Sequence, residues 1–204
     1  MTATILFTAT CLLFVMMVPT RPHAQGQTET LRYKVLHNEE SIGSLTVTRT
    51  CNADSCTYHM STRVRTRLLF TFTTASDEES TLVNGSIVRS NFNRNLNGKK
   101  IEKTLYSTSN RYWMKVNGEW RDLGQMPSCP SSLSLYHEEP RQHPCLWSDN
   151  YMERLPVTPA GLATWKVDYP DGGNGFFHYE NGVASRIEMH STIYDYAIVL
   201  EKKY

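Results

Sequence analysis

The stretch TYHMSTRVRTRLLFTFT, at residues 57–73, decides how the rest of the sequence is interpreted. Its even-numbered positions carry apolar groups and threonines, whereas polar groups, among them Arg63, Arg65 and Arg67, occupy the odd-numbered positions before Leu69. Alternation with a period of two is typical of a β-strand, because a helix would scatter both sets around its circumference. At about 3.3 Å per residue the run would span roughly 50 Å, so we expect it to bend or break once near Arg67. The pattern predicts a long central strand of a curved antiparallel sheet.

Shorter alternating segments on both sides of this stretch predict further strands. Residues 31–37 and 43–50 form two of them before it. The dipeptide Asn-Gly occurs at 84–85, 97–98, 117–118 and 181–182. It readily adopts the positive φ angles of a type I′ turn, so each copy marks a hairpin. Consecutive strands joined by hairpins pair as neighbours in a meander.

Two later segments complete the predicted sheet. Residues 77–80 follow the long central strand and lead into a short strand ending at Val83. The last strand is predicted over residues 186–201, where the inward face changes from odd to even positions, and a bulge near Ser191 would cause that change. In total, the sequence predicts about ten strands and one short helix. The predicted class is all-β, mainly antiparallel, with the meander curved into a half-barrel or barrel.

A proline-rich insert interrupts the strand pattern at residues 126–159. Ser131 or Ser132 could cap a short helix that runs through Glu139 and is stopped by Pro140. The insert is therefore expected to form a helical plug or lid over one end of the sheet.

The N-terminal residues 1–24 resemble a signal peptide, because residues 5–18 are almost continuously apolar and too short to cross a bilayer. The alternative is a cytosolic protein with a buried N-terminal helix. Residues 25–204 are expected to form one domain, and no second apolar segment could span a membrane. Removing residues 1–24 takes away Arg21 and no acid, which leaves 20 basic and 20 acidic residues and a net charge of 0. A neutral chain has no global field that would attract nucleic acid.

Four cysteines remain after residue 24, and an even number in an exported chain is typical of disulfides. Of the three possible pairings we favour Cys51–Cys56 with Cys129–Cys145, because the first pair flanks the turn-forming tetrapeptide Asn-Ala-Asp-Ser and the second brackets the insert. Zinc is the competing interpretation, but the sequence has no close Cys-x-x-Cys pair.

No motif of a hydrolase, metalloprotease, nucleotide-binding protein or thioredoxin occurs in the sequence, and no cofactor is indicated. The densest polar group is His137, Glu138, Glu139 and His143, which could bind a metal or supply an acid and a base; a solvated helix end is the plainer interpretation.

Two further polar sets stand out on predicted strands. His178 and His190 lie on neighbouring strands and could face each other. The arginines of the central strand could bind a phosphate or carboxylate, or they could pair with acids such as Glu78 or Glu102 on adjoining strands.

Several short segments resemble those of a known family. They are Leu135-Tyr136-His137-Glu138-Glu139-Pro140, Trp147-Ser148-Asp149 and Phe177-His178-Tyr179-Glu180-Asn181-Gly182-Val183, together with Tyr33-Lys34-Val35 and Ile42-Gly43 near the start. They resemble exported bacterial β-rich proteins grouped as a domain of unknown function. His137 stands where that family usually has Phe, and Asp149 where Glu tends to follow Ser. The resemblance implies an envelope location and a β-rich fold akin to the open barrels of lipoprotein carriers, and it implies no reaction.

Three functions are compatible with these observations. The first is a secreted or periplasmic, non-catalytic protein that binds an amphipathic or lipid-like ligand on the apolar face of the sheet. The residues expected to bind it are Tyr58, Met60, Val64, Leu68, Phe70, Phe92 and Tyr112. The second is a structural or partner-binding envelope protein, which would expose an apolar patch or an unpaired sheet edge. The third is a hydrolase built around His137 and His143, which requires both side chains to converge.

Overall fold

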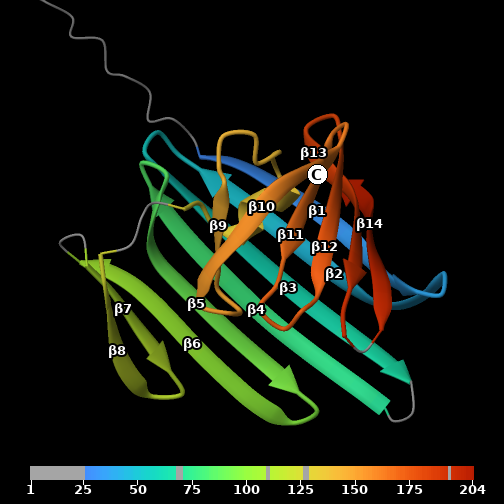
Figure 1. The fold of residues 1–204 in the computed structure, drawn as a ribbon, viewed down its shortest axis with the longest axis horizontal. Coiled ribbons are helices and arrows are strands. Elements are labelled where there is room, and N and C mark those ends of the chain that lie inside the picture. The colour runs from blue at the N-terminus through green and yellow to red at the C-terminus, as the bar shows by residue number, and fades with distance from the viewer. Residues whose placement is uncertain (1–25, 68–70, 109–110, 126–128, 193) are drawn as a thin grey trace, which may run out of the picture.

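The computed structural model describes residues 26–67, 71–108, 111–125, 129–192 and 194–204, so the expected signal peptide lies outside the described residues. Within them, one sheet contains fourteen strands in the order β8-β7-β6-β5-β4-β3-β2-β1-β14-β13-β12-β11-β10-β9. The end strands β8 and β9 are not paired with each other there, and the sheet curves into an open half-barrel (Figure 1). This confirms the all-β class.

Strands β1 to β8 form one meander and strands β9 to β14 a second, the two meanders meet where β1 pairs with β14, and every pairing between strands is antiparallel. Their bounds are β1 Gln27–His37, β2 Glu40–Cys51, β3 Ser55–Arg67, β4 Thr71–Val83, β5 Ser86–Leu96, β6 Lys99–Thr108, β7 Arg111–Val116, β8 Glu119–Gly124, β9 Cys145–Ser148, β10 Glu153–Gly161, β11 Thr164–Asp168, β12 Asn174–Glu180, β13 Val183–His190 and β14 Asp195–Lys203.

All four Asn-Gly dipeptides form the turns that the sequence predicted. Their asparagines have φ angles between 48° and 51°, and the glycines after them lie between 75° and 98°. Positive φ at both central positions is the type I′ geometry, whose twist matches that of the flanking strands. These turns join β4 to β5, β5 to β6, β7 to β8 and β12 to β13.

The predicted alternation separates a buried concave face from an outer face. On β1, Leu31, Tyr33 and Val35 are buried, and on β3 Met60 and Val64 are buried. The outward residues between them, including the arginines at 63 and 65, are exposed. Burial of one face in each strand fixes the register, because a slip of one residue would expose the whole apolar set.

The segment 57–73, however, is not one strand. β3 ends at Arg67, β4 starts at Thr71, and the two pair side by side with Thr66 opposite Phe72. The expected break near Arg67 is therefore a complete reversal of the chain. β4 then continues through residues 77–80, so these residues belong to a strand and do not lie between two strands as predicted.

The last predicted strand is also two strands. β13 ends at His190, β14 begins at Asp195, and these two residues are opposite each other in the register. A chain reversal, not a bulge near Ser191, causes the change of inward positions from Ile187 to Ile198. The described sheet has fourteen strands, where about ten were predicted, because, besides this split, β8, β9 and β10 were not predicted as strands.

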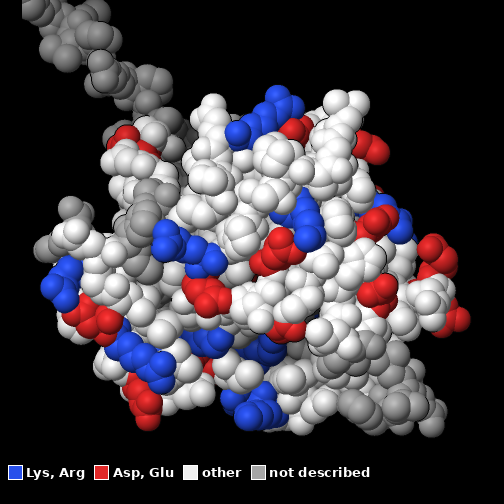
Figure 2. Space-filling view, viewed as in Figure 1, with Lys and Arg blue, Asp and Glu red and all other residues white. Residues whose placement is uncertain are grey.

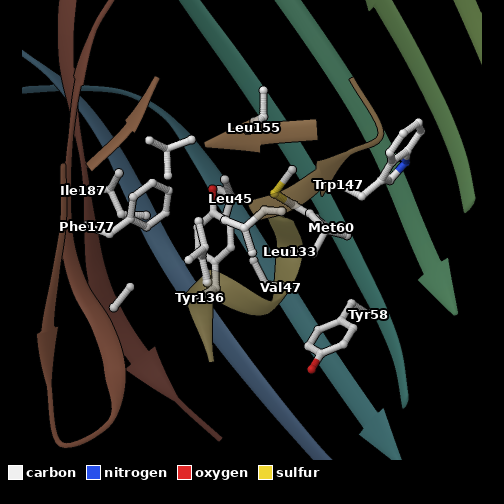
Figure 3. Packing of buried hydrophobic residues seen from close by; sticks show 14 of the residues in the cluster. Leu45, Val47, Tyr58, Met60, Leu133, Tyr136, Trp147, Leu155, Phe177 and Ile187 are labelled. Carbon is white, nitrogen blue, oxygen red and sulfur yellow. The ribbon is translucent and has the colours of Figure 1, made fainter. Parts of the chain in front are cut away.

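Residues 129–144 form a plug inside the curve of the sheet, whereas the later part of the predicted insert is not loop or helix, because it contains β9 and most of β10. The one regular turn of the plug is the 3-10 helix η1 (Ser132–Tyr136), capped by Ser131, whose Oγ accepts a hydrogen bond from the Leu133 amide at 3.2 Å. Of the two predicted capping residues Ser131 is the one that caps, and the helix ends at Tyr136, before Glu139. Leu133 and Tyr136 point into the interior between Met60 on one side and Phe177 and Ile187 on the other (Figure 3).

Both predicted disulfides are present. Cys51–Cys56 closes the β2–β3 hairpin, and Cys129–Cys145 ties the start of the insert to β9. Structural disulfides are typical of proteins from an oxidising compartment outside the cytosol. In the part of the chain that the structure describes, there is no helix with the length and apolar character needed to span a bilayer.

Candidate functional site

Two adjoining hollows of about 330 and 190 Å³ lie between the concave face of the sheet and the plug. They share ten lining residues, so we treat them as one site and call it the cleft. These residues come from β3, β4, the plug, the loops after β9 and β11, and strands β12 to β14: Met60, Glu78, Tyr136, Asn150, Tyr151, Tyr169, Asp171, Phe177, Met189 and Tyr196. The interior is therefore only partly filled by side chains.

Apolar side chains from distant strands form the walls of the larger hollow. These side chains are apolar because each occupies an inward-facing position in the alternation described above. They are Val35, Leu45, Met60, Val64, Phe72, Leu96, Phe177, Met189 and Ile198. Such a lining with a few polar groups is the usual composition of a small-molecule site, and 330 Å³ lies in the common range of about 300–1,000 Å³.

One acidic side chain, Glu78 on β4, faces this apolar lining. It lies on the concave side because it alternates in phase with the buried residues Ser76 and Ser80, and only 7% of its surface is exposed. Burial, together with the nearby Asp149 carboxylate, raises the pKa of Glu78 to about 8 against the opposing charges of Arg94 and Lys103. Glu78 is therefore mostly protonated at neutral pH, and it can donate as well as accept a hydrogen bond.

Asp149 lies behind this group and is fully buried. Its Oδ1 accepts a hydrogen bond from the Ser90 hydroxyl at 2.6 Å, and its Oδ2 accepts one from the Ser80 hydroxyl. Burial raises the pKa of Asp149 to about 6, although both serine hydrogen bonds oppose the rise. Because both oxygens are engaged and no surface is exposed, Asp149 supports the wall and does not reach a ligand.

Two cationic side chains complete the polar wall. Lys103 on β6 donates to the Asn150 carbonyl oxygen, and burial lowers its pKa. The Arg94 guanidinium on β5 lies 4.9 Å from the centre of the Phe92 ring, and its buried Nε has no hydrogen-bond partner. The wall thus contains two acids and two bases, with one carboxyl and one guanidinium N–H unused.

Both hollows of the cleft are lined by Tyr151, Tyr169 and Tyr196 together with the apolar residues. Tyr151 stacks on Tyr169 with ring centres 5.8 Å apart, and its hydroxyl donates to Asp171 Oδ2 at 2.6 Å. Burial raises the pKa of both tyrosines and brings that of Tyr196 to about 12, so these hydroxyls stay neutral. Aromatic rings with polar tips suit a boundary between apolar and wet surroundings.

Buried polar contacts hold the plug against the sheet. The Tyr179 hydroxyl donates to the Leu135 carbonyl at 2.9 Å, and His137 Nδ1 lies 2.7 Å from Glu29 Oε2. Burial lowers the pKa of His137 even though Glu29 favours the charged ring. For Glu29 burial alone would raise the pKa, but hydrogen bonds from Lys203 and His137 lower it overall. The plug is therefore a fixed wall of the cleft.

The structure distributes the residues expected to bind a ligand over several places. Met60 and Val64 line the cleft. Phe92 is buried under the Arg94 and Lys103 side chains, Tyr58 packs against His137, and Tyr112 is buried on β7 without lining either hollow. Leu68 and Phe70 lie outside the described residues.

The polar group at residues 137–143 does not converge. The His137 side chain is fully buried beside Glu29, whereas His143 is exposed, so no site contains both histidines. Glu139 pairs with Arg141 at 2.8 Å on the surface. Among the residues placed by the structure, no three His, Cys, Asp or Glu side chains are arranged to hold a metal ion.

Two other predicted juxtapositions are wrong. His178 is opposite Arg186 in the β12–β13 register and His190 is opposite Asn174, so the histidines do not face each other. Arg63 and Arg65 are exposed on the outer face, whereas Glu78 is buried on the concave face, and Arg63 donates to Ser61 at 3.4 Å instead. On the face shown in Figure 2, acidic and basic groups are interspersed, with no large field of one sign.

Sequence reasoning missed Glu78, Arg94 and Asp149. A signal for Glu78 was available, because Ser76, Glu78 and Ser80 continue the even-numbered inward positions of the preceding segment. Arg94 and Asp149 carried no such signal, since their surroundings come from strands far away in sequence. The geometry around them shows no pair of accessible acids, because Asp149 is enclosed.

Comparisons with known proteins agree with this architecture. A comparison with curated protein sequences finds no match. The chain is similar to a solved structure, the crystal structure of a beta-barrel-like protein of the domain of unknown function DUF1849 from Brucella abortus. The TM-score is 0.53 at 12% sequence identity, over 89% of this chain and 98% of that one, which shows a shared fold. A family model, the domain of unknown function DUF6134, matches residues 33–201. This chain is therefore a member of the DUF6134 family.

Proposed function

We propose that this protein is a non-catalytic binding protein, which holds the apolar chain of an amphipathic, lipid-like ligand in the cleft. The observation that carries the proposal is the unfilled hollow of about 330 Å³ on a concave face whose strands are otherwise packed. Folding alone favours a filled interior, since an apolar void forfeits van der Waals contacts. A hollow lined on one side by aliphatic groups and on the other by Glu78 and Arg94 suits a molecule with an apolar chain and a polar head.

Export of the protein from the cytosol is part of the same proposal. The two disulfides and the apolar segment at residues 5–18 support export, to the periplasm or the exterior. A lipid-like ligand in such a compartment would need a protein that shields its chain from water. The disulfide-anchored plug supports this role, because it keeps one wall of the cleft in place when the ligand leaves.

Filling the cleft tests the proposal. Thr62 lines the larger hollow, so Thr62→Trp should occupy the space of the ligand chain. Ser44→Trp on the exposed face of the adjacent strand β2 is the matched control. Binding of the neutral fluorescent probe N-phenyl-1-naphthylamine is measured with and without a dodecyl amphiphile as competitor. We expect the Thr62 variant to bind at least about tenfold more weakly and the control to match the wild type.

Two results would overturn the proposal. The first is a wild-type protein that binds neither the probe nor any amphiphile. The second is a folded Thr62→Trp variant, with an unchanged thermal transition, that binds as well as the wild type.

A second candidate function, binding of an envelope protein partner, is supported by one surface observation. Trp120 on edge strand β8 is 49% exposed, packs against Tyr106 at 5.2 Å and lies beneath Lys115. Aromatic groups beside an unpaired strand edge are typical of partner contacts. A photo-crosslinking residue at position 120 should capture one discrete partner in cells, and the same residue at the isolated, exposed Leu162 should not. Equal labelling at both positions would exclude this function.

A further inference from the structure

Glu78 is the one feature of the cleft that a ligand with an apolar chain does not explain. The residue is more than nine-tenths buried, and it lines both hollows. In the described part of the chain, no hydrogen bond or ion pair reaches it. A buried carboxyl without a partner destabilises a fold, so a partner supplied by a ligand would account for its presence.

The neighbouring side chains do not supply that partner. Lys103 is directed to the Asn150 carbonyl, and Asp149 is held by its two serines. Arg94 stacks on the Phe92 ring and lines the larger hollow, and among the described residues no acceptor engages its guanidinium. The Glu78 carboxyl and the guanidinium of Arg94, which lines the larger hollow, are thus both available at the same polar wall of the cleft.

The charge balance of this wall selects the kind of head group. At neutral pH Glu78 is mostly protonated, so the charges of this wall are the Asp149 carboxylate and the cations Arg94 and Lys103, which outnumber it and would repel a cationic head. A charged head would also lose its hydration on entering a largely buried site. An uncharged head with both a donor and an acceptor satisfies Glu78 and Arg94 without either cost.

We propose that Glu78 and Arg94 form the head-group subsite of the cleft, and that the ligand has an uncharged head carrying a hydroxyl or amide. This inference rests on the proposed function, because it assigns the polar end of the same site. A monoacylglycerol is the simplest probe of this class, since its hydroxyls donate to Glu78 while its ester carbonyl accepts from Arg94.

The test compares three amphiphiles that share one chain length: glycerol monolaurate, laurate and dodecyltrimethylammonium. Each is titrated below its micelle concentration at pH 7 against the wild type, Glu78→Gln and Glu78→Leu. We expect the wild type to bind the uncharged amphiphile at least about tenfold more tightly than the charged ones. Glu78→Gln keeps a donor and an acceptor, so it should retain this preference, whereas Glu78→Leu should reduce it to less than about threefold.

Asp77→Leu is the matched control, because Asp77 is the exposed residue next to Glu78 and faces outward. Its preference should equal that of the wild type. If no amphiphile binds, the proposed function fails. If all three bind the wild type equally well, or if Glu78→Leu keeps the preference, ligand binding stands and the head-group assignment is overturned.

Discussion

Replacing Glu78 with Gln should stabilise the protein at neutral pH and change its stability little in mild acid. The variant keeps the size and the hydrogen-bonding groups of a protonated carboxyl but cannot ionise. The pKa of Glu78 is about 8 in the folded protein and 4.5 in the absence of the fold, because burial and Asp149 disfavour the anion. The size of the effect follows from this difference.

The sign follows from proton binding in the two states. Between pH 4.5 and 8 the unfolded chain has released the proton that the folded chain retains, so the stability of the wild type decreases as the pH rises. At about 1.4 kcal/mol per pH unit, the loss is roughly 1 kcal/mol at pH 5 and roughly 3 kcal/mol at pH 7. Glu78→Gln does not undergo this loss. Its advantage over the wild type should therefore grow by roughly 2 kcal/mol between pH 5 and pH 7.

Urea denaturation followed by tryptophan fluorescence measures this difference at half-unit steps of pH. Asp77→Asn, at the exposed neighbouring position, is the control and should track the wild type within about 0.5 kcal/mol. An advantage of Glu78→Gln that stays constant within the same margin from pH 5 to pH 7 would refute the reasoning. It would mean that Glu78 ionises in the folded protein as it does in water.

Three further predictions follow from other parts of the structure. Cys129→Ser opens a disulfide that spans 16 residues, and it should reduce the free energy of unfolding in urea by about 3 kcal/mol. A Cβ at Gly43 would lie 2.3 Å from a backbone oxygen of β3, so Gly43→Ala should lower stability by at least about 2 kcal/mol; Gly26→Ala, with its nearest contact at 3.4 Å, should be nearly neutral in the same assay. Asp149→Asn removes a carboxylate that raises the pKa of Glu78, so an NMR titration of the Glu78 side chain should show a lower pKa than in the wild type. An unchanged midpoint would contradict the coupling.

The elements read most reliably from the sequence are those set by local chemistry. Asn-Gly turns formed at all four positions because the dipeptide favours positive φ whatever the surroundings. The Cys51–Cys56 bond closes a hairpin, and the intervening tetrapeptide Asn-Ala-Asp-Ser consists mainly of residues that favour turns. The alternation on β1 and β3 correctly identified the buried face, because one face of each strand is covered by the rest of the fold.

The two wrong strand assignments have one geometric cause. In the β3–β4 register, Thr66 is opposite Phe72 and both numbers are even, so the inward face keeps its parity through the reversal. In the β13–β14 register, Ile187 is opposite Ile198, so the parity changes and resembles a bulge. Side-chain alternation alone therefore cannot separate a tight reversal from a continuing strand.

The candidate site was harder to predict because its character comes from distant contacts. The sequence around Glu78 is Asp-Glu-Glu-Ser, which has the composition of a solvated turn. Its burial depends on the plug and on strands β11 to β14, which are more than 50 residues away along the chain. The serines that hold Asp149 likewise come from β4 and β5, 69 and 59 residues before it.

The most direct measurement of the central claim is a crystal structure of the protein with a monoacylglycerol brominated at the end of its chain. We expect an anomalous bromine peak inside the curve of the sheet, among Leu45, Val64 and Ile198, and the glycerol head beside Glu78. Bromine bound only on the outer surface, or an interior without ligand at saturating concentration, would contradict the central claim.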